Sequence, residues 1–166
     1  MKKFLFLAAM LLLACLPLTS CGGDDEPTET NNAKATFLMD FSQDLLDASN
    51  ILIYYKANDE VRWEPINNRN WTKTVNSDRL PAEFGVMYRF SPKDLTKDKY
   101  NLKCTLTISI TTSTGTNYSK QITIIDEPDV EKSRVAETLK NYNNHSTGFR
   151  VTKEGDVNIT DGLKYE

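Results

Sequence analysis

The longest regular pattern in the chain runs from Tyr100 to Thr111, where apolar and polar residues alternate without a break. A period of two places each set on one face of a strand. The segment is therefore predicted to be an antiparallel strand with one face buried and the other in water. A register slip of one residue would turn the whole apolar set into water, so the register is firmly specified. Cys104 belongs to the apolar set, where a cysteine is expected to be a small, buried and unreactive side chain.

Shorter alternating stretches predict more strands. They lie at 35–41, 51–55, 61–63, 71–75, 84–90 and 118–125, and a last hairpin combines 149–151 with 157–159. Pro65 is expected to stop the third of these strands, and 71–75 is expected to be a short edge strand. Residues 42–47 predict a polar turn, with room for one turn of helix.

The spacing changes after Pro128. Val135, Ala136, Leu139 and Tyr142 fall on one face at helical spacing, which predicts a helix over 129–142 that begins just after the proline. Seven or eight strands with one helix favour a mainly β fold. We expect a two-sheet antiparallel sandwich of the immunoglobulin-like or transthyretin-like kind, in a single domain over 34–162.

The first 20 residues have the order of a secretory signal peptide. Lys2 and Lys3 precede an apolar run of 13 residues at 4–16, and small polar residues follow Pro17. A helix needs about 20 apolar residues to cross a bilayer, so this run is too short to span one.

The tetrapeptide Leu18-Thr19-Ser20-Cys21 resembles the lipobox of bacterial lipoproteins. That resemblance implies that Cys21 is acylated and becomes the first mature residue. The membrane would then be a partner through lipid alone, and each buried methylene contributes about 0.8 kcal/mol. Leu12-Leu13-Ala14-Cys15 is a second candidate box, but acylation at Cys15 would leave an apolar stub on the mature end.

Residues 21–33 hold no large apolar side chain after the cysteine, so we expect a lipidated N-terminus and a disordered linker. The acids Asp24, Asp25 and Glu26 resemble the export signal of surface lipoproteins in the Bacteroidetes. The resemblance implies an outer-membrane lipoprotein that is exposed at the cell surface.

Charge and cysteine content limit the partners and the cross-links that we expect for this protein. Removal of residues 1–20 takes away two of the 20 basic side chains and none of the 23 acids, leaving a formal charge of −5. A mildly acidic chain without a basic run argues against nucleic acid as a partner. Cys104 has no partner cysteine in the mature chain, so no internal disulfide is expected.

Catalytic and metal-binding patterns are mostly missing. His145 lies in an asparagine-rich loop with no nucleophile apparent nearby, and the nucleophile-elbow, phosphate-loop and zinc patterns do not occur. Residues 156–162 depart from a calcium loop in the position of the glycine, and Asp40, Asp44 and Asp47 are more simply a solvated turn. The sequence therefore predicts no enzyme, no cofactor and no metal.

Aromatic residues suggest a binding role. Five of them gather in the first half of the chain: Tyr54, Tyr55, Trp63, Trp71 and Tyr88. Exposed aromatics on a sandwich form platforms on which sugar rings stack. Trp71 follows a run of asparagines and is the preferred contact, whereas Trp63 is expected to fill the core. The candidate contacts are Trp71, Trp63 and Tyr54.

These observations favour a non-catalytic module that binds a glycan or a protein at the cell envelope. One alternative is an enzyme or accessory subunit acting on glycans. Another is a structural component of a surface complex.

The lipid anchor gives a direct prediction. Cys21→Ala removes the thiol to which the lipid is joined, so the protein should move from the membrane fraction to the soluble fraction of lysed cells. Cys15→Ala is the control and should leave the distribution unchanged. Mass spectrometry of the mature N-terminal peptide checks the site, and a lipid on Cys15 would contradict the assignment.

Overall fold

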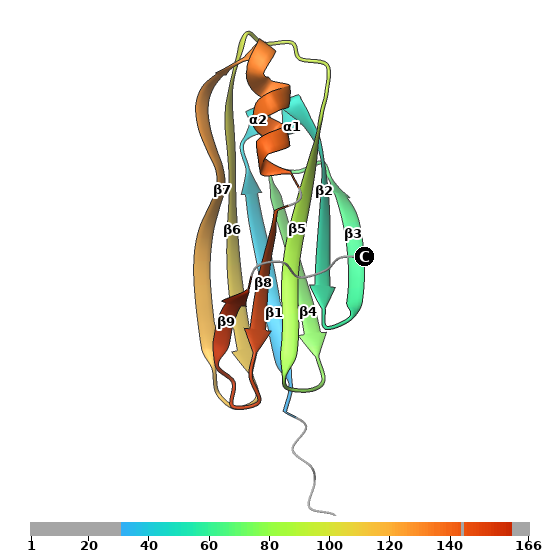
Figure 1. Cartoon of the computed structure of the whole chain (residues 1–166), viewed down its shortest axis with the longest axis vertical. Helices are drawn as coiled ribbons and strands as arrows, with labels where there is room; N and C mark the ends of the chain where they lie inside the picture. The colour runs from blue at the N-terminus through green and yellow to red at the C-terminus, as the bar shows by residue number, and fades with distance from the viewer. Residues whose placement is uncertain (1–30, 144, 161–166) are drawn as a thin grey trace, which may run out of the picture.

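The computed structural model describes residues 31–143 and 145–160. The predicted signal peptide, Cys15, Cys21 and nearly all of the predicted linker lie outside these ranges, as does the end of the predicted domain at 161–162. The described residues form nine strands in two antiparallel sheets (Figure 1).

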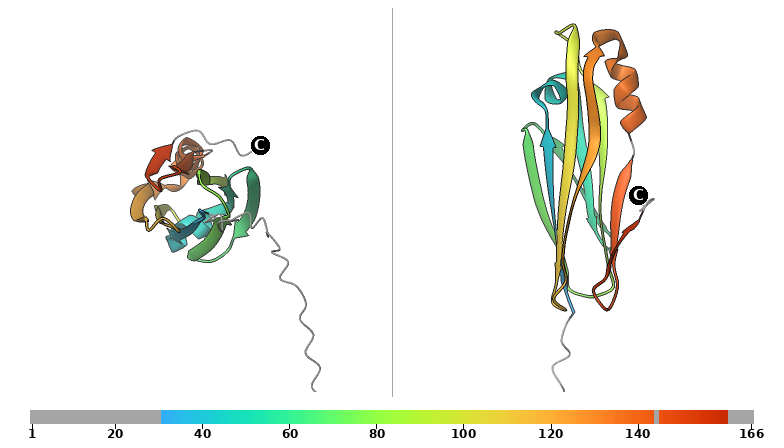
Figure 2. Two further views of the ribbon diagram at one scale, coloured as in Figure 1. Left: turned by 90° about the horizontal axis from the view of Figure 1, so that it is seen from below. Right: turned by 90° about the vertical axis from the view of Figure 1, so that its left-hand side faces the viewer.

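The first sheet has four strands in the order β4-β1-β6-β7. Their bounds are Ala33–Phe41 for β1, Asn70–Ser77 for β4, Lys99–Thr112 for β6 and Asn117–Glu131 for β7. The second sheet has five strands in the order β3-β2-β5-β8-β9. Their bounds are Ser49–Ala57 for β2, Glu60–Ile66 for β3, Ala82–Pro92 for β5, Ser146–Val151 for β8 and Val157–Thr160 for β9. The right-hand view of Figure 2 shows the two sheets as separate layers.

Two helices carry the chain between the sheets. α1 (Gln43–Ala48) joins β1 to β2, and the Ser42 hydroxyl caps it by accepting from the Leu45 amide at 3.2 Å. α2 (Val135–Tyr142) follows a short 3₁₀ turn at Lys132–Arg134 and leads from β7 to β8. Both helices lie at one end of the sandwich, and β1 begins at the other end (Figure 1).

The core lies between the inward faces of the two sheets, as the alternating pattern predicts. Every apolar position of the Tyr100–Ile110 alternation is fully buried. The opposing sheet contributes fully buried aromatic and aliphatic side chains: Ile53, Phe84, Phe90 and Phe149. Burial of one such side chain is worth about 1.5–3 kcal/mol relative to leaving it in water. The predicted mainly β sandwich is therefore confirmed, with nine strands in place of seven or eight.

The helix prediction was wrong at its start. Residues 129–131 still belong to β7, and α2 begins at Val135. β7 is an edge strand whose pairing with β6 shifts between Tyr100 and Leu102, so Pro128 needs no ladder hydrogen bond there. Asp129 has φ +52°, and its amide donates to Asn101 Oδ1 at 3.0 Å. The proline lies in an edge irregularity and not before a helix.

Two other boundaries were also wrong. β3 runs through Pro65 to Ile66, because an edge strand tolerates a proline. Ala33, placed in the linker, is buried as the first residue of β1. Asn32 is bound to the β6–β7 turn, since its carbonyl accepts from the Ser113 amide at 3.0 Å and its amide donates to Ser113 Oγ at 3.0 Å.

Two of the acids predicted to form a solvated turn are ion-paired. Lys97 Nζ lies 2.7 Å from Asp44 Oδ1 and 2.8 Å from Asp47 Oδ2, and it connects α1 to the loop before β6. Tyr100 holds the same loop, because its hydroxyl accepts from the Thr96 and Lys97 amides at 2.8 and 2.9 Å. This cluster has an evident structural role.

Burial of Cys104 gives a second prediction. Cys104 lies in the middle of β6, and burial raises the pKa of its thiol, so very little reactive thiolate forms at neutral pH. We expect no maleimide labelling of Cys104 in the native protein and full labelling after unfolding in guanidinium chloride, measured by mass spectrometry of the peptide. Labelling of the native protein at the rate of a free thiol would contradict this burial.

Candidate binding surface

The outward face of the five-stranded sheet carries the exposed aromatic residues. Along β2, alternate residues point outward, and these are Asn50, Leu52, Tyr54 and Lys56, of which Lys56 is buried. The β2–β3 register pairs Tyr54 with Trp63 and Leu52 with Pro65, so the outward side of β3 presents Trp63 beside Tyr54. Directly opposite side chains on neighbouring strands are about 5 Å apart at Cβ, so the two rings are neighbours.

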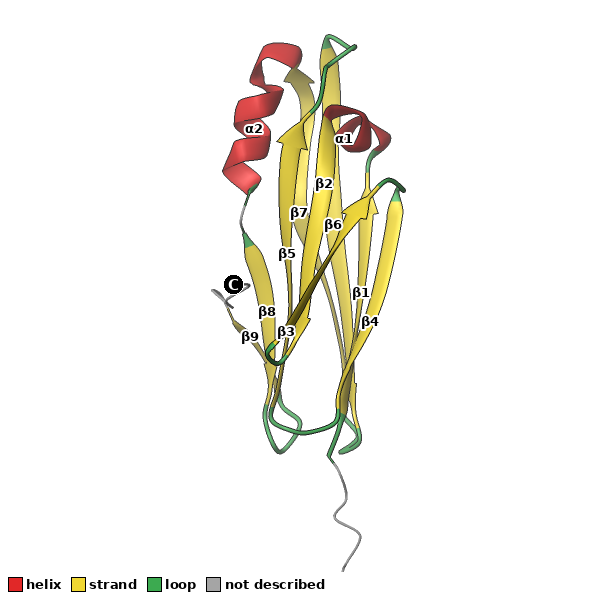
Figure 3. Ribbon diagram, turned by 90° about the vertical axis from the view of Figure 1, so that its right-hand side faces the viewer, coloured by secondary structure: helices red, strands yellow, loops and turns green. Residues whose placement is uncertain are grey.

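Trp63 is 61% exposed, which makes the prediction that it fills the core wrong. The cause is the position of β3 at the edge of its sheet, visible at the near side of the molecule in Figure 3. Ile66, at the end of β3, points inward and is buried. The other inward positions, Glu60, Arg62 and Glu64, are polar and lie on the side of the edge strand β4. Val61, Trp63 and Pro65 are on the outward side.

Trp71 is only 8% exposed, so the prediction that it is an exposed contact is also wrong. It is an inward residue of β4 and packs on Tyr55, with the ring centroids 5.8 Å apart. Its indole Nε1 donates to Glu64 Oε2 at 3.1 Å. The alternation of Trp71 and Val75 with polar Thr72 and Thr74 indicates that the two apolar side chains share one face, but not that this face is the buried one.

Tyr54 is half-buried at the centre of a mixed surface. The guanidinium carbon of Arg89, from β5, lies 5.6 Å from the centroid of the Tyr54 ring. Half-buried Leu52, Val61 and Met87 surround the pair. We call the outward residues of β2, β3 and β5 the outer patch, and its members are Leu52, Tyr54, Val61, Trp63, Pro65, Met87 and Arg89.

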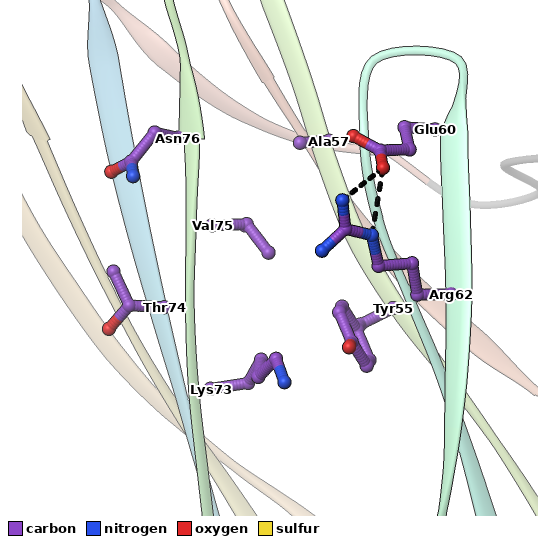
Figure 4. A pocket seen from close by; sticks show the side chains of 8 residues that line it. All are labelled: Tyr55, Ala57, Glu60, Arg62, Lys73, Thr74, Val75 and Asn76. Carbon is purple, nitrogen blue, oxygen red and sulfur yellow. Dashed lines mark hydrogen bonds and ion pairs between the residues drawn. The ribbon is translucent and has the colours of Figure 1, made fainter.

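A second candidate is a hollow of about 250 Å³ between β2 and β3 on one side and β4 on the other (Figure 4). Arg62 and Lys73 point into it from opposite strands, and each is ion-paired, Arg62 with Glu60 and Lys73 with Glu64. Lys73 Nζ also lies 4.9 Å from the centroid of the Tyr55 ring. The cations of this hollow are therefore already neutralised by neighbouring acids.

Glu64 is the centre of a polar network that includes two residues of the hollow's lining, Tyr55 and Lys73. It accepts hydrogen bonds from Lys73, from Trp71 Nε1 and from the Tyr55 hydroxyl at 2.8 Å. These donors, Lys73 first, lower the pKa of the Glu64 carboxyl from its ordinary value of 4.5 to about 2. The network connects the edge strand of one sheet to the edge strand of the other, which indicates a structural role.

The remaining candidate groups are His145 and the acidic residues considered for metal binding. His145 is exposed, as expected of a loop histidine. Within residues 31–143 and 145–160, no three side chains among His, Cys, Asp and Glu lie close enough to bind a metal ion together. No helix in this described part is both long and apolar enough to cross a membrane.

Comparison with family models, with curated proteins and with solved structures gave no match. The function must therefore be inferred from the residues of the outer patch.

The Glu64 network predicts a pH-dependent stability. Glu64→Gln keeps the shape of the side chain but removes the charge, so the free energy of unfolding should fall by about 1 kcal/mol at pH 7. Because the folded carboxyl has the lower pKa, its contribution is present above pH 4.5 and is lost as the pH falls from 4.5 towards 2. Urea unfolding at a series of pH values measures both effects.

Glu60→Gln is the matched control. Glu60 is 64% exposed and pairs only with the exposed Arg62, so its removal should change the free energy of unfolding by less than about 0.5 kcal/mol. Equal losses in the two variants, or a Glu64→Gln effect that does not shrink in acid, would contradict the proposed role of the network.

Proposed function

We propose that this protein is a non-catalytic binding module, held at the outer-membrane surface by lipid on Cys21, and that it binds a glycan over the outer patch. The observation that carries the proposal is the exposed Trp63 indole, which lies directly opposite Tyr54 on the neighbouring strand. Trp63 adjoins further apolar residues of the outer patch, and a contiguous apolar patch at a surface is a candidate contact for a partner.

The chemistry of this pair suits a sugar ring. An indole face packs against the C–H groups of a pyranose and buries a large area, while the ring hydroxyls remain free to form hydrogen bonds with polar neighbours. Trp63 and Tyr54 project from paired strands, so little conformational freedom is lost on binding.

The attachment point is compatible with an accessible patch. The described chain begins at the end of the sandwich opposite the helices, where Asn32 is bound to Ser113 (Figure 1). The outer patch lies along the side of the sandwich, on β2, β3 and β5, and not at the end where the linker would enter. A linker from Cys21 would therefore leave the patch free to meet an extended polymer.

The enzyme alternative has less support. Glycoside hydrolysis needs two carboxyl groups opposed across the sugar, one of them able to hold a proton near neutral pH. Glu64 has a pKa of about 2 and is occupied by three donors, and Glu60 is paired with Arg62. On the outward face, Glu83 is paired with Lys56 and Arg150. These carboxylates form ion pairs with neighbouring lysine and arginine side chains, which does not suit them to act as a general acid.

Trp63→Ala tests the proposal. We expect binding on a glycan array to weaken at least 30-fold for the glycans that the wild-type full chain binds, equivalent to a loss of about 2 kcal/mol. The free energy of unfolding should change by less than about 0.5 kcal/mol, because Trp63 is mostly exposed.

Leu38→Ala is the control, since Leu38 is 37% exposed on the outward face of the other sheet. It should leave glycan binding unchanged. Binding that survives Trp63→Ala, or that Leu38→Ala removes equally, would contradict a site on the outer patch.

A further inference from the structure

We infer that the glycan bound by the outer patch is acidic, and that Arg89 contacts its carboxylate or sulfate group. This inference rests on the proposed function and adds the chemical class of the ligand. It depends on three features of the outward face: its charge, the absence of an acidic partner for Arg89 in the described structure, and the alignment of Arg89 with Tyr54 and Trp63.

The outward face of the five-stranded sheet has the opposite sign of charge to the whole chain. Its outward positions on β2, β3, β5 and β8 carry two exposed cations, Arg89 and Arg150, and the buried Lys56, which is 7% exposed, against one acid, Glu83. The chain as a whole has a formal charge of −3. A positive face on an acidic protein attracts anions.

Within this face, the cations are not equivalent. Glu83 is shared by Lys56 Nζ at 3.7 Å and by Arg150 Nε at 3.0 Å. Arg89 forms no salt bridge with any residue in the described ranges 31–143 and 145–160. The Arg89 side chain is exposed. The pairing of β5 with β8 ends at Met87 and Ser146, so Arg89 has no residue of β8 opposite it. Arg89 is therefore a cation with its hydrogen-bond donors available to a ligand.

The position of Arg89 matches that of a second contact for a sugar chain. Arg89, on β5, is opposite Leu52 of β2 and diagonal to Tyr54. Its guanidinium lies over the Tyr54 ring. Three adjacent strands, β5, β2 and β3, therefore present a guanidinium, a phenol ring and an indole in one diagonal row. Strands are about 4.8 Å apart, so the row spans about 10 Å, comparable to two linked pyranose rings.

The chemistry then selects the ligand class. A planar guanidinium forms two parallel hydrogen bonds with a carboxylate or sulfate, which a neutral sugar cannot accept with the same strength. A pyranose stacked on Trp63 would place the acidic group of the neighbouring residue within reach of Arg89. The ligand that fits both contacts is a polyuronate or a related acidic polysaccharide.

The test compares polygalacturonate with its fully methyl-esterified form, in which a methyl ester replaces each carboxylate and removes its charge. The full chain, purified in detergent, should bind polygalacturonate at least 10-fold more tightly in calorimetry, and the preference should weaken as salt is raised. Arg89→Gln should reduce binding of polygalacturonate to that of the ester, whereas Arg89→Lys should retain part of the preference. Arg150→Gln is the matched control and should have little effect, because Arg150 is already paired with Glu83.

The outcomes separate the two proposals. If both polymers bind equally and Arg89→Gln changes nothing, the acidic ligand is wrong while a neutral glycan on Trp63 stands. If neither polymer binds, the inference is overturned, and an empty glycan array would overturn the proposed function as well. Arg89-dependent binding to phosphatidylglycerol vesicles without binding to polygalacturonate would assign the positive face to a membrane and overturn the glycan ligand.

Discussion

Burial of the inward faces of the two sheets against each other is the interaction on which this structure depends. β6 and β1 supply one apolar layer, and β2 and β5 supply the other. Because every strand alternates with a period of two, each residue that is buried forces its neighbours outward. The outward surfaces are thus a consequence of the core, and the binding surface proposed for this protein is one of them.

At the edge strand β3, the same alternation gives a different distribution of polar and apolar residues. β3 has no partner beyond it, and its inward side meets the edge strand β4 instead of the apolar layer. Charged residues therefore occupy the inward side, where Glu64 collects donors from Tyr55, Trp71 and Lys73. Apart from the buried Ile66, the apolar residues of β3 lie on the other side, where Trp63 meets water. The polar network and the exposed Trp63 therefore lie on opposite faces of the same short strand, β3.

This arrangement is well suited to binding. The network fixes β3 to β4 across the open side of the sandwich, and β2 fixes it through the ladder, so Trp63 projects from a strand held on both sides. Preorganised aromatic groups lose little entropy when a ligand binds. Arg89 adds a charge at a defined place on the same surface, where electrostatic complementarity contributes to specificity more than to affinity.

The sequence by itself determined the elements whose pattern is long or strongly alternating. The Tyr100–Ile110 alternation is sufficient for a half-buried strand, and the last hairpin and the two-layer fold follow from similar patterns. It also named Tyr54 and Trp63 as candidate contacts, but it did not show on which face of the sheet they lie. The boundaries at Pro65 and Pro128 could not be placed, since a proline is tolerated wherever a strand is at an edge.

Only the tertiary structure decided which tryptophan meets solvent. Trp63 and Trp71 both alternate with polar residues, and the local pattern is the same whichever side is buried. The choice depends on what lies across from each strand: Trp71 on β4 faces Tyr55 and Glu64, while the outward side of β3 faces water. Contacts between strands far apart in the chain carry that information, and no local period contains it.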